Sequence, residues 1–349
     1  MSADVRYVSP DRVGFYGPLA PSQARQIAAD PIVKHLQTSE PATEQTWRTI
    51  DAEVCARRPD ITIRVYGHYG TSCDLSLIRW LPSVRRFEVD VHNVERLDEL
   101  EQLHRLEHLG LAVFESSDLS VLSRVTDTLV SLEVGATRSK KPDMAPLARF
   151  RDLRKLYVEG QSKNIEAIAD LTELEDLTLR SVTTPDLRYV QPLSKLWSLD
   201  IKLGGIRSLD GATGKASTKY LELWQIRTFD TIEELGDFPG LQHLFLQSLP
   251  LVTRFPDMSR SADLRRIELM NMKGLRDFTS IEQLPGLKEF RLFEGQAQQP
   301  DDLIPVLRND KLQRAGAWFG SMRRNDRFLE LLSEYGKQPW TEHEPFSFT

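Results

Sequence analysis

The sequence has few cysteines, no long apolar run and no recognisable export signal. Only two of its 349 residues are cysteine, and secreted repeat proteins with disulfide-bonded caps usually carry more. No run of about 18 apolar residues is present, so no transmembrane helix is predicted. The N-terminal residues lack the basic and apolar regions of a secretory signal. We therefore expect a cytoplasmic protein without a membrane partner.

An excess of basic residues is also missing. The formal net charge is −6, and the densest basic stretch contains only Arg138, Lys140 and Lys141. Proteins that bind nucleic acids neutralise phosphates with a basic face. The charge therefore argues against a nucleic-acid partner.

Sequence motifs for catalysis, metals and nucleotides are absent as well. The seven histidines form no HExxH or Cys/His array, and neither Cys55 nor Cys73 lies in a nucleophile motif. His104 and His108 are four residues apart, but we expect His104 in a return segment and His108 on a strand. The stretch GATGKAST, 211–218, lacks the spacing of a phosphate-binding loop. We predict no enzyme activity, no catalytic residue, no metal site and no cofactor.

What the sequence does contain is a repeated pattern, L-x-x-L-x-L, whose copies start 21 to 25 residues apart. The clear copies are VRRFEV from Val84, LEHLGL from Leu106, LVSLEV from Leu129, LRKLYV from Leu153, LEDLTL from Leu174, LWSLDI from Leu196, TKYLEL from Thr218, LQHLFL from Leu241, LRRIEL from Leu264 and LKEFRL from Leu287. Weaker copies flank them, near Ile63 and from Leu312. Regular spacing of this kind predicts a repeat architecture.

The pattern predicts the structure of each unit. Alternating apolar residues have a period of two, which indicates a short strand with one buried face. Between strands, apolar residues recur every third position, as from Val94 to Leu106, which favours short 3₁₀ turns. One unit cannot bury its apolar edge alone, whereas about 12 stacked units form a continuous core and a curved parallel sheet.

This pattern resembles the leucine-rich-repeat family, specifically its short class of about 22 residues per repeat. In the unit 174–195 the apolar positions hold Leu174, Leu177, Leu179, Leu187, Val190 and Leu193. The resemblance covers residues 60–320. It implies an α/β solenoid, a right-handed superhelix of about 12 coils with a curved parallel sheet on its concave face.

The chain departs from the family pattern at the turn position that usually holds asparagine. That position holds His92, Phe114, Val182, Gly204, Ile226, Leu249 or Met272. We therefore expect no asparagine ladder in the turns.

A stacked core needs a polar cap at each end. We interpret residues 1–59 as an N-terminal cap with short strands VRYV and VGFY and helices over 21–36 and 43–57. The second helix would place Trp47, Ile50 and Val54 on one face. The alternative is a separate recognition domain.

Residues 321–349 are interpreted as the C-terminal cap. A helix from Asp326 to Tyr335 would point Phe328, Leu331 and Leu332 inward, and we expect the tail TEHEPFSFT to be loosely packed.

The third, fifth and seventh residues of L-x-x-L-x-L-x point away from the core, onto the concave face. In the first half of the array they include small or acidic residues, typical of an ordinary solvated surface: Arg64, Glu88, Asp90, Gly110, Ala112, Glu133, Gly135 and Glu159. In the second half they include Tyr220, Glu222, Trp224, Phe245, Arg266, Glu268, Met270, Glu289, Arg291, Phe293, Arg314 and Trp318.

The second half therefore carries the candidate binding residues. Trp224, Met270, Phe293 and Trp318 should form one column with Gln247 between them, and Phe245 should lie one column over. Aromatic residues, methionine and arginine are enriched in protein interfaces. We predict a protein partner here, with Arg266, Arg291 and Arg314 pairing with its acidic groups.

Two alternatives to a separate protein partner stay open for these residues. The C-terminal tail, with Trp340, Phe346 and Phe348, could fold back over them, or they could mediate self-association of a chain that is otherwise monomeric. Five strands span only about 20–25 Å, less than a standard interface needs, so a partner would also contact rim loops or the acidic first half.

The function predicted is therefore a non-enzymatic protein-binding module. One form is an inhibitor or immunity protein that covers a basic toxin or enzyme, because the first half is acidic. Another is an effector or scaffold in a host or signalling complex. A different class, an enzyme or small-ligand binder that uses the concave face, would need a cluster of convergent polar residues.

Overall fold

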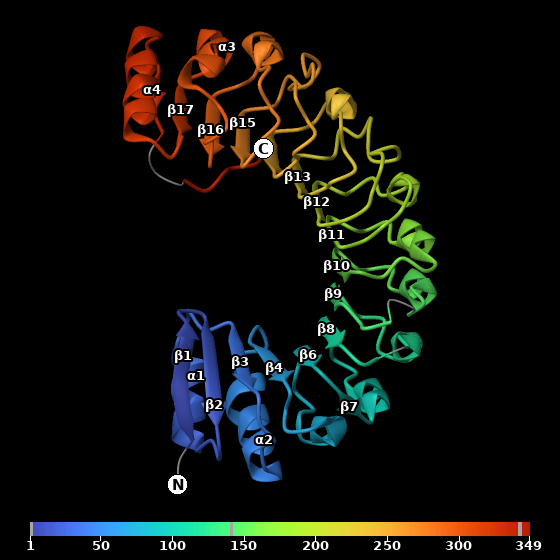
Figure 1. The fold of residues 1–349 in the computed structure, drawn as a ribbon. Helices are drawn as coiled ribbons and strands as arrows, with labels where there is room; N and C mark the ends of the chain where they lie inside the picture. The colour runs from blue at the N-terminus through green and yellow to red at the C-terminus, as the bar shows by residue number, and fades with distance from the viewer. Residues whose placement is uncertain (1–2, 117, 140–141, 341–343) are drawn as a thin grey trace. The chain divides into compact units, whose positions relative to one another are not determined.

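The computed structural model describes residues 3–116, 118–139, 142–340 and 344–349 (Figure 1). Lys140, Lys141 and the first three tail residues, 341–343, lie outside these ranges. The chain divides into two compact units, Met1–Leu174 and Glu175–Thr349. Within each unit, parallel strands lie side by side along one face, and 3₁₀ turns or short helices lie along the other.

Unit 1 begins with the antiparallel pair β1 and β2 and continues with parallel strands. The strands are β1 (Asp4–Ser9), β2 (Arg12–Tyr16), β3 (His35–Thr38), β4 (Thr62–Gly67), β6 (Arg86–Val91), β8 (His108–Val113), β9 (Ser131–Val134) and β10 (Lys155–Glu159). A small separate sheet pairs β5 (Cys73–Asp74) with β7 (Val94–Glu95). The return segments are α1 (Pro21–Ala29), α2 (Glu44–Ile50) with a wider helical turn over Asp51–Cys55, and 3₁₀ turns over Leu75–Trp80, Leu97–Gln102, Ser120–Ser123, Ala145–Arg149 and Ile165–Asp170.

Unit 2 repeats the arrangement with more regular coils. Its parallel strands are β11 (Asp176–Arg180), β12 (Ser198–Lys202), β13 (Tyr220–Trp224), β14 (His243–Gln247), β15 (Arg266–Met270), β16 (Glu289–Phe293), β17 (Arg314–Ala317) and β18 (Gln338–Pro339). Its return segments are Arg188–Val190, Glu233–Asp237, Thr279–Gln283, Pro300–Leu303, α3 (Ile304–Arg308) and α4 (Met322–Glu334).

The core of each unit lies between the strands and the return segments. The inward residues of successive strands, such as Leu199, Leu221 and Leu244, are fully buried. Apolar residues of the return segments, such as Ile168 and Leu235, are also fully buried against them. The predicted stack of strand-and-turn coils is therefore confirmed.

The turns after the strands of unit 2 are regular although they lack the usual asparagine ladder. Each strand from β11 to β16 is followed by a residue in the left-handed region, with φ between +51° and +59°: Ser181, Leu203, Gln225, Ser248, Asn271 and Glu294. The N–H of Leu203 donates to the carbonyl of Trp224 at 2.8 Å, and the turns at Ser181, Gln225, Ser248 and Asn271 repeat this bond. Backbone bonds thus align successive turns, which leaves the usual asparagine position free for buried apolar residues such as Ile226 and Met272.

The N-terminal segment differs from the prediction in one place. The expected helix over 21–36 ends at Ala29, and His35–Thr38 forms strand β3 instead. Pro31 explains the early end, because proline has no N–H to donate and disfavours helix in the residue before it. The helix expected over 43–57 is present as α2 and the following turn, and Trp47, Ile50 and Val54 are buried as predicted.

The helix predicted from Asp326 to Tyr335 is present as α4, which begins four residues earlier at Met322 and ends at Glu334, with Phe328, Leu331 and Leu332 buried as predicted. The expectation of a loosely packed tail is wrong for residues 344–349, which make ring contacts and hydrogen bonds to the sheet. No helix among the described residues is both long enough and apolar enough to cross a membrane.

Candidate functional site

The concave face of unit 2 carries three columns of side chains, in the register that the sequence predicts. The first lies at the starts of the strands and is called the start column: Tyr220, His243, Arg266, Glu289 and Arg314. The middle column contains Glu222, Phe245, Glu268, Arg291 and Gly316. The end column contains Trp224, Gln247, Met270 and Phe293, and continues at Trp318 directly after β17.

The start column is linked by ion pairs within the chain. Glu289 accepts a hydrogen bond from Arg266 Nε at 2.6 Å and another from Arg314 Nε at 2.9 Å. Arg266 is only 2% exposed, because the ring of Trp340 lies 4.6 Å from its guanidinium. Two of the arginines predicted to pair with a partner are therefore already paired inside the chain.

The charges of the middle column are also paired within the chain, although Oε1 of Glu268 is buried without a hydrogen-bond partner. The guanidinium of Arg291 lies between two rings, 4.5 Å from Phe293 and 4.3 Å from Trp340, and 3.7 Å from Glu268. Burial alone would raise the pKa of Glu268, but contact with His243 and the nearby arginines outweighs it and lowers that pKa. Glu268 therefore stays ionised and holds Arg291 in place.

The C-terminal tail covers the start column. Phe348 packs 5.1 Å from the ring of Trp197 and 6.2 Å from that of Tyr220, and Phe346 packs 5.1 Å from His243. The backbone N–H of Thr349 donates to Gln242 Oε1 at 3.0 Å. The tail therefore folds back over outward residues, which is one of the two alternatives left open above. It covers the start column and not the end column.

The end column stays open. Trp224, Met270 and Phe293 are half-buried, and Trp318 is 60% exposed. These side chains follow the carboxyl ends of the strands. Among the sequence-predicted residues they form the uncovered apolar group.

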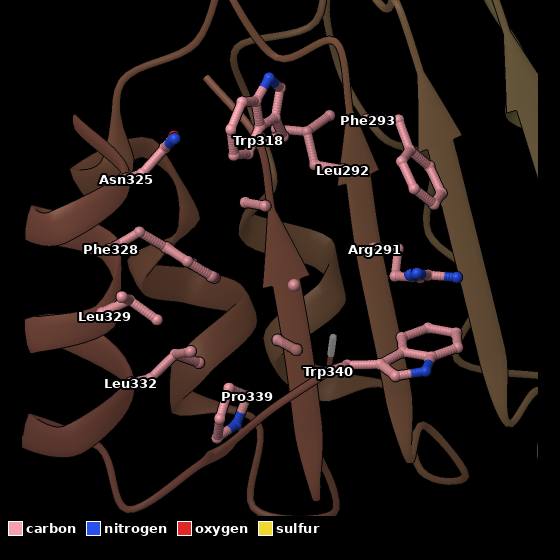
Figure 2. A pocket seen from close by; sticks show the side chains of 13 residues that line it. Arg291, Leu292, Phe293, Trp318, Asn325, Phe328, Leu329, Leu332, Pro339 and Trp340 are labelled. Atoms are coloured by element: carbon pink, nitrogen blue, oxygen red, sulfur yellow. The ribbon is translucent and has the colours of Figure 1, made fainter. Parts of the chain in front are cut away.

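An apolar pocket of about 360 Å³ adjoins the end column, between β16, β17, β18 and α4 (Figure 2). Its wall includes Phe293, Trp318, Leu329 and Trp340. The pocket exists because β17 carries small side chains: a Cβ at Gly316 would lie 2.5 Å from the carbonyl oxygen of Trp340. The pocket was not predicted from the repeat pattern, since its walls come from segments that touch only after folding.

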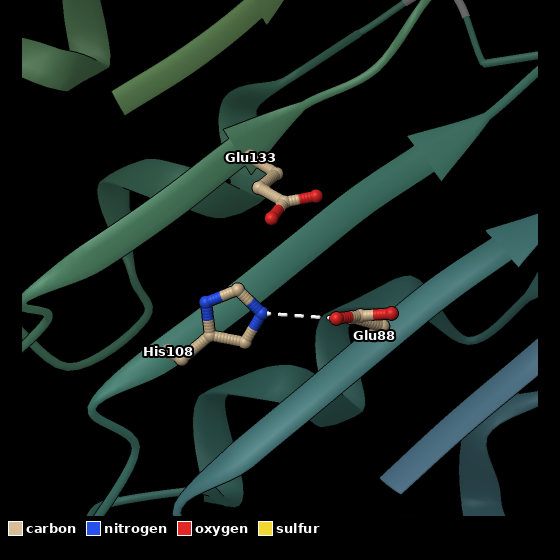
Figure 3. Close-up of side chains that lie close together, drawn as sticks. All are labelled: Glu88, His108 and Glu133. Atoms are coloured by element: carbon tan, nitrogen blue, oxygen red, sulfur yellow. Dashed lines mark hydrogen bonds and ion pairs between the residues drawn. The ribbon is translucent and has the colours of Figure 1, made fainter. Parts of the chain in front are cut away.

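The concave face of unit 1 is more organised than the solvated surface predicted from its small and acidic residues. It contains a polar pocket of about 350 Å³. Glu88, in its wall, lies 3.2 Å from His108 Nε2 (Figure 3). It also lies 3.8 Å from Nε2 of His35. Arg64 Nε lies 3.5 Å from the other carboxylate oxygen of Glu88. The histidines come from separate coils, so spacing along the chain gave no sign of their convergence.

The two cysteines do not resemble nucleophiles. Both are free and buried. Burial raises the pKa of Cys73 to about 12 and that of Cys55 further. The reactive thiolate is therefore scarce at neutral pH. His104 lies in a return segment and His108 on β8, as predicted.

No protein-family model and no curated protein matches the sequence. Several solved structures do match. An internalin (InlF) of Listeria monocytogenes superposes with a TM-score of 0.57 and 20% identity over 87% of this chain and 86% of that chain. TLR13, solved in complex with ssRNA13, gives a TM-score of 0.52 and 14% identity over 86% of this chain and 52% of that chain. An LRR protein of Leptospira interrogans has 13% identity and a TM-score of 0.41, with 93% and 100% of the two chains covered.

The internalin and TLR13 are leucine-rich-repeat proteins. The chain has the leucine-rich-repeat fold, an α/β solenoid of parallel strands and short return segments, as its repeat pattern predicts. Because the sequence identities are only 13–20%, the similarity to these structures shows the fold alone.

Proposed function

We propose that this chain is a non-enzymatic binding protein that takes up a protein partner on the concave face of unit 2. The observation that carries the proposal is the uncovered end column beside the apolar pocket. Trp318, Phe293 and Met270 are residue types that dominate the buried centres of protein interfaces. Apolar side chains gathered at an open surface commonly mark a binding site.

The chemistry of the face indicates how a partner would bind. An apolar side chain of the partner would enter the pocket between Trp318 and Leu329, and its surroundings would cover Phe293, Met270 and Trp224. Arg266, Arg291 and Arg314 serve a supporting role, because glutamates of the chain already neutralise them. Tyr220 is covered by the tail. Glu222, Phe245 and Glu268 belong to the middle column, which lies directly beside the end column.

The form of binding protein that we favour is a cytoplasmic inhibitor or immunity-type protein that covers a basic toxin or enzyme. The net charge of −6 and two free, buried cysteines support this form. A basic partner would be steered towards an acidic chain at low ionic strength. An effector or scaffold role would use the same face with a partner of another charge.

The test is a pair of substitutions at the end column. Phe293→Ala with Trp318→Ala removes two anchors, each worth about 2 kcal/mol in a typical interface centre. We expect recovery of the partner by the immobilised chain to fall by at least about 30-fold. The partner, once identified by mass spectrometry, is then titrated calorimetrically against wild type and variant.

The matched control is Leu251→Ala, which removes an apolar side chain that is 54% exposed and lies outside the end column and pocket. It should leave recovery unchanged. Circular dichroism checks that both variants fold. Equal recovery of the same partner by wild type and the double variant would refute the proposed face.

A further inference from the structure

Three potential metal ligands converge on the concave face of unit 1. Glu88 on β6, His108 on β8 and Glu133 on β9 each offer one ligand atom, and these atoms lie within 4.8 Å of one another (Figure 3). They come from three neighbouring parallel strands. Since each strand adds one coil to the solenoid, stacking alone brings the three side chains together.

A glycine between the two glutamates makes their approach possible. Gly110 on β8 lies opposite Glu88 on one side and opposite Glu133 on the other. A Cβ at Gly110 would lie 2.7 Å from Cγ of Glu88. Any larger residue would therefore push Glu88 away, whereas glycine lets the glutamate lean over the central strand.

His108 is held in the orientation of a metal ligand. Its side chain is only 3% exposed, and Nδ1 lies 3.0 Å from the hydroxyl of Ser131, which leaves Nε2 facing the carboxylates. Metal-bound histidines are usually oriented in this way, with the second ring nitrogen donating to an oxygen. The separation of 3.2 Å between Nε2 and Glu88 Oε1 also suits two ligands of one ion, each about 2.1 Å from the metal.

Of the three potential ligands, Glu133 is the one whose carboxylate is not engaged in other contacts. Among the described residues it has no hydrogen bond or ion pair at its carboxylate. Glu133 is exposed, and its carboxylate lies in the same cluster as that of Glu88. The positive charge nearest Glu88 is shared, because Arg64 also pairs with Asp90 and donates to Gln37. A bound cation would pair directly with both carboxylates, which no single cationic side chain of the described residues does.

We propose that Glu88, His108 and Glu133 bind one divalent transition-metal ion, Zn²⁺ in the first instance. One imidazole nitrogen with two carboxylate oxygens suits Zn²⁺, whereas Ca²⁺ and Mg²⁺ prefer oxygen ligands alone. Glu88 and Glu133 also line the polar pocket of about 350 Å³, so an ion held by them would be accessible to water or to a carboxylate of a bound molecule. The site does not depend on the partner-binding face of unit 2.

The test uses the full chain without a histidine tag, treated with a chelator, dialysed and titrated with ZnCl₂ by calorimetry. We expect one ion per chain. Glu133→Gln keeps the size of the side chain and removes one ligand charge, and should weaken Zn²⁺ binding by at least about tenfold. His108→Gln should weaken it further. The matched control, Glu107→Gln, removes a charge next to His108 in sequence and should leave the affinity unchanged.

A spectroscopic measurement locates the ion. Co²⁺ bound in place of Zn²⁺ should give visible absorption bands of a low-symmetry site in the wild type and in Glu107→Gln, and Glu133→Gln should lose them. Ser131→Ala, which removes the group that orients His108, should weaken Zn²⁺ binding by about tenfold. Circular dichroism of the metal-free variants separates lost binding from lost folding. No binding by the wild type, or wild-type affinity in folded Glu133→Gln, would overturn the proposal.

Discussion

At the scale of single residues, Asp200 is a charged side chain that is largely buried on the face of unit 2. It lies opposite Glu222 in the neighbouring strand, and Lys202 Nζ is 3.2 Å from each carboxylate. Its Oδ1 is buried without a hydrogen-bond partner. Burial, and then the charge of Glu222, raises the pKa of Asp200 to about 6. One lysine therefore balances two carboxylates that neighbouring strands bring together.

The raised pKa of Asp200 predicts a pH-dependent stability. Between about pH 4 and 6 the folded chain keeps a proton at Asp200 that the unfolded chain releases, so stability falls as the pH rises through this window. Asp200→Asn cannot lose that proton. From pH 4 to 7 we expect the wild type to lose up to about 3 kcal/mol relative to Asp200→Asn.

Urea unfolding of both proteins at pH 4, 5, 6 and 7 measures this difference. Titrating groups that do not contact Asp200 are shared and cancel when the two free energies of unfolding are subtracted. A difference that stays constant across the series would show that Asp200 ionises normally.

At the scale of elements, polar side chains of one coil cap backbone carbonyls of the coil before it. Asn309, which is fully buried, donates from Nδ2 to the carbonyls of Ile281 at 2.8 Å and Leu284 at 2.9 Å. Its Oδ1 accepts from the backbone N–H groups of Lys311 and Leu312 at 2.8 and 3.2 Å. Such bonds satisfy backbone groups at turns that a solenoid buries between its coils.

Gln298 and Lys337 act in the same way in neighbouring coils. Gln298 Nε2 donates to the carbonyls of Met272 and Leu275, and Lys337 Nζ donates to those of Asn309 and Leu312. In the family pattern, a ladder of asparagine side chains binds backbone groups of the turns. Here Asn309, Gln298 and Lys337 bind backbone groups of the return segments instead.

Removal of Asn309 should therefore be costly. Asn309→Ala removes all four hydrogen bonds. The carbonyl of Leu284 and the N–H of Lys311 then lose their partner, whereas the carbonyl of Ile281 and the N–H of Leu312 keep a backbone bond. Each buried group without a partner costs about 1–3 kcal/mol. We expect a loss of at least about 3 kcal/mol in the free energy of unfolding, measured by urea denaturation. Asn93→Ala, at an exposed turn, serves as the control and should cost less than about 1 kcal/mol. A loss at Asn309 no larger than at Asn93 would contradict the capping role.

At the scale of the whole molecule, stability is a sum of contributions from neighbouring coils. In a solenoid each repeat contacts only the next ones, so a local defect affects nearby coils first. The two compact units, divided after Leu174, fit this description.

Hydrogen exchange of Asn309→Ala tests this local coupling. We expect faster exchange of backbone amides in β16, β17 and α4, which lie next to the lost cap, because these elements open more often. Strands β4, β6 and β8 of unit 1 should exchange as in the wild type. Equal acceleration in both units would indicate one cooperative block instead.

The repeat pattern was enough to predict the solenoid and the strand register. Period-two alternation defines which residues point inward, and a shift by one residue would expose Leu221 and Leu223 while burying Glu222. The three columns of unit 2 followed from that constraint. Apolar spacing does not mark the early end of the first helix, because Pro31 and not the spacing ends it.

The sequence by itself therefore determined the coil, the buried leucines and the positions of the outward side chains, because these depend on local periodicity. The tertiary structure alone decided which outward side chains remain open. Residues 344–349 cover the start column, α4 and Trp340 form the pocket beside Trp318, and three strands bring Glu88, His108 and Glu133 together. These contacts join residues far apart in the chain, and no local pattern records which distant segments meet.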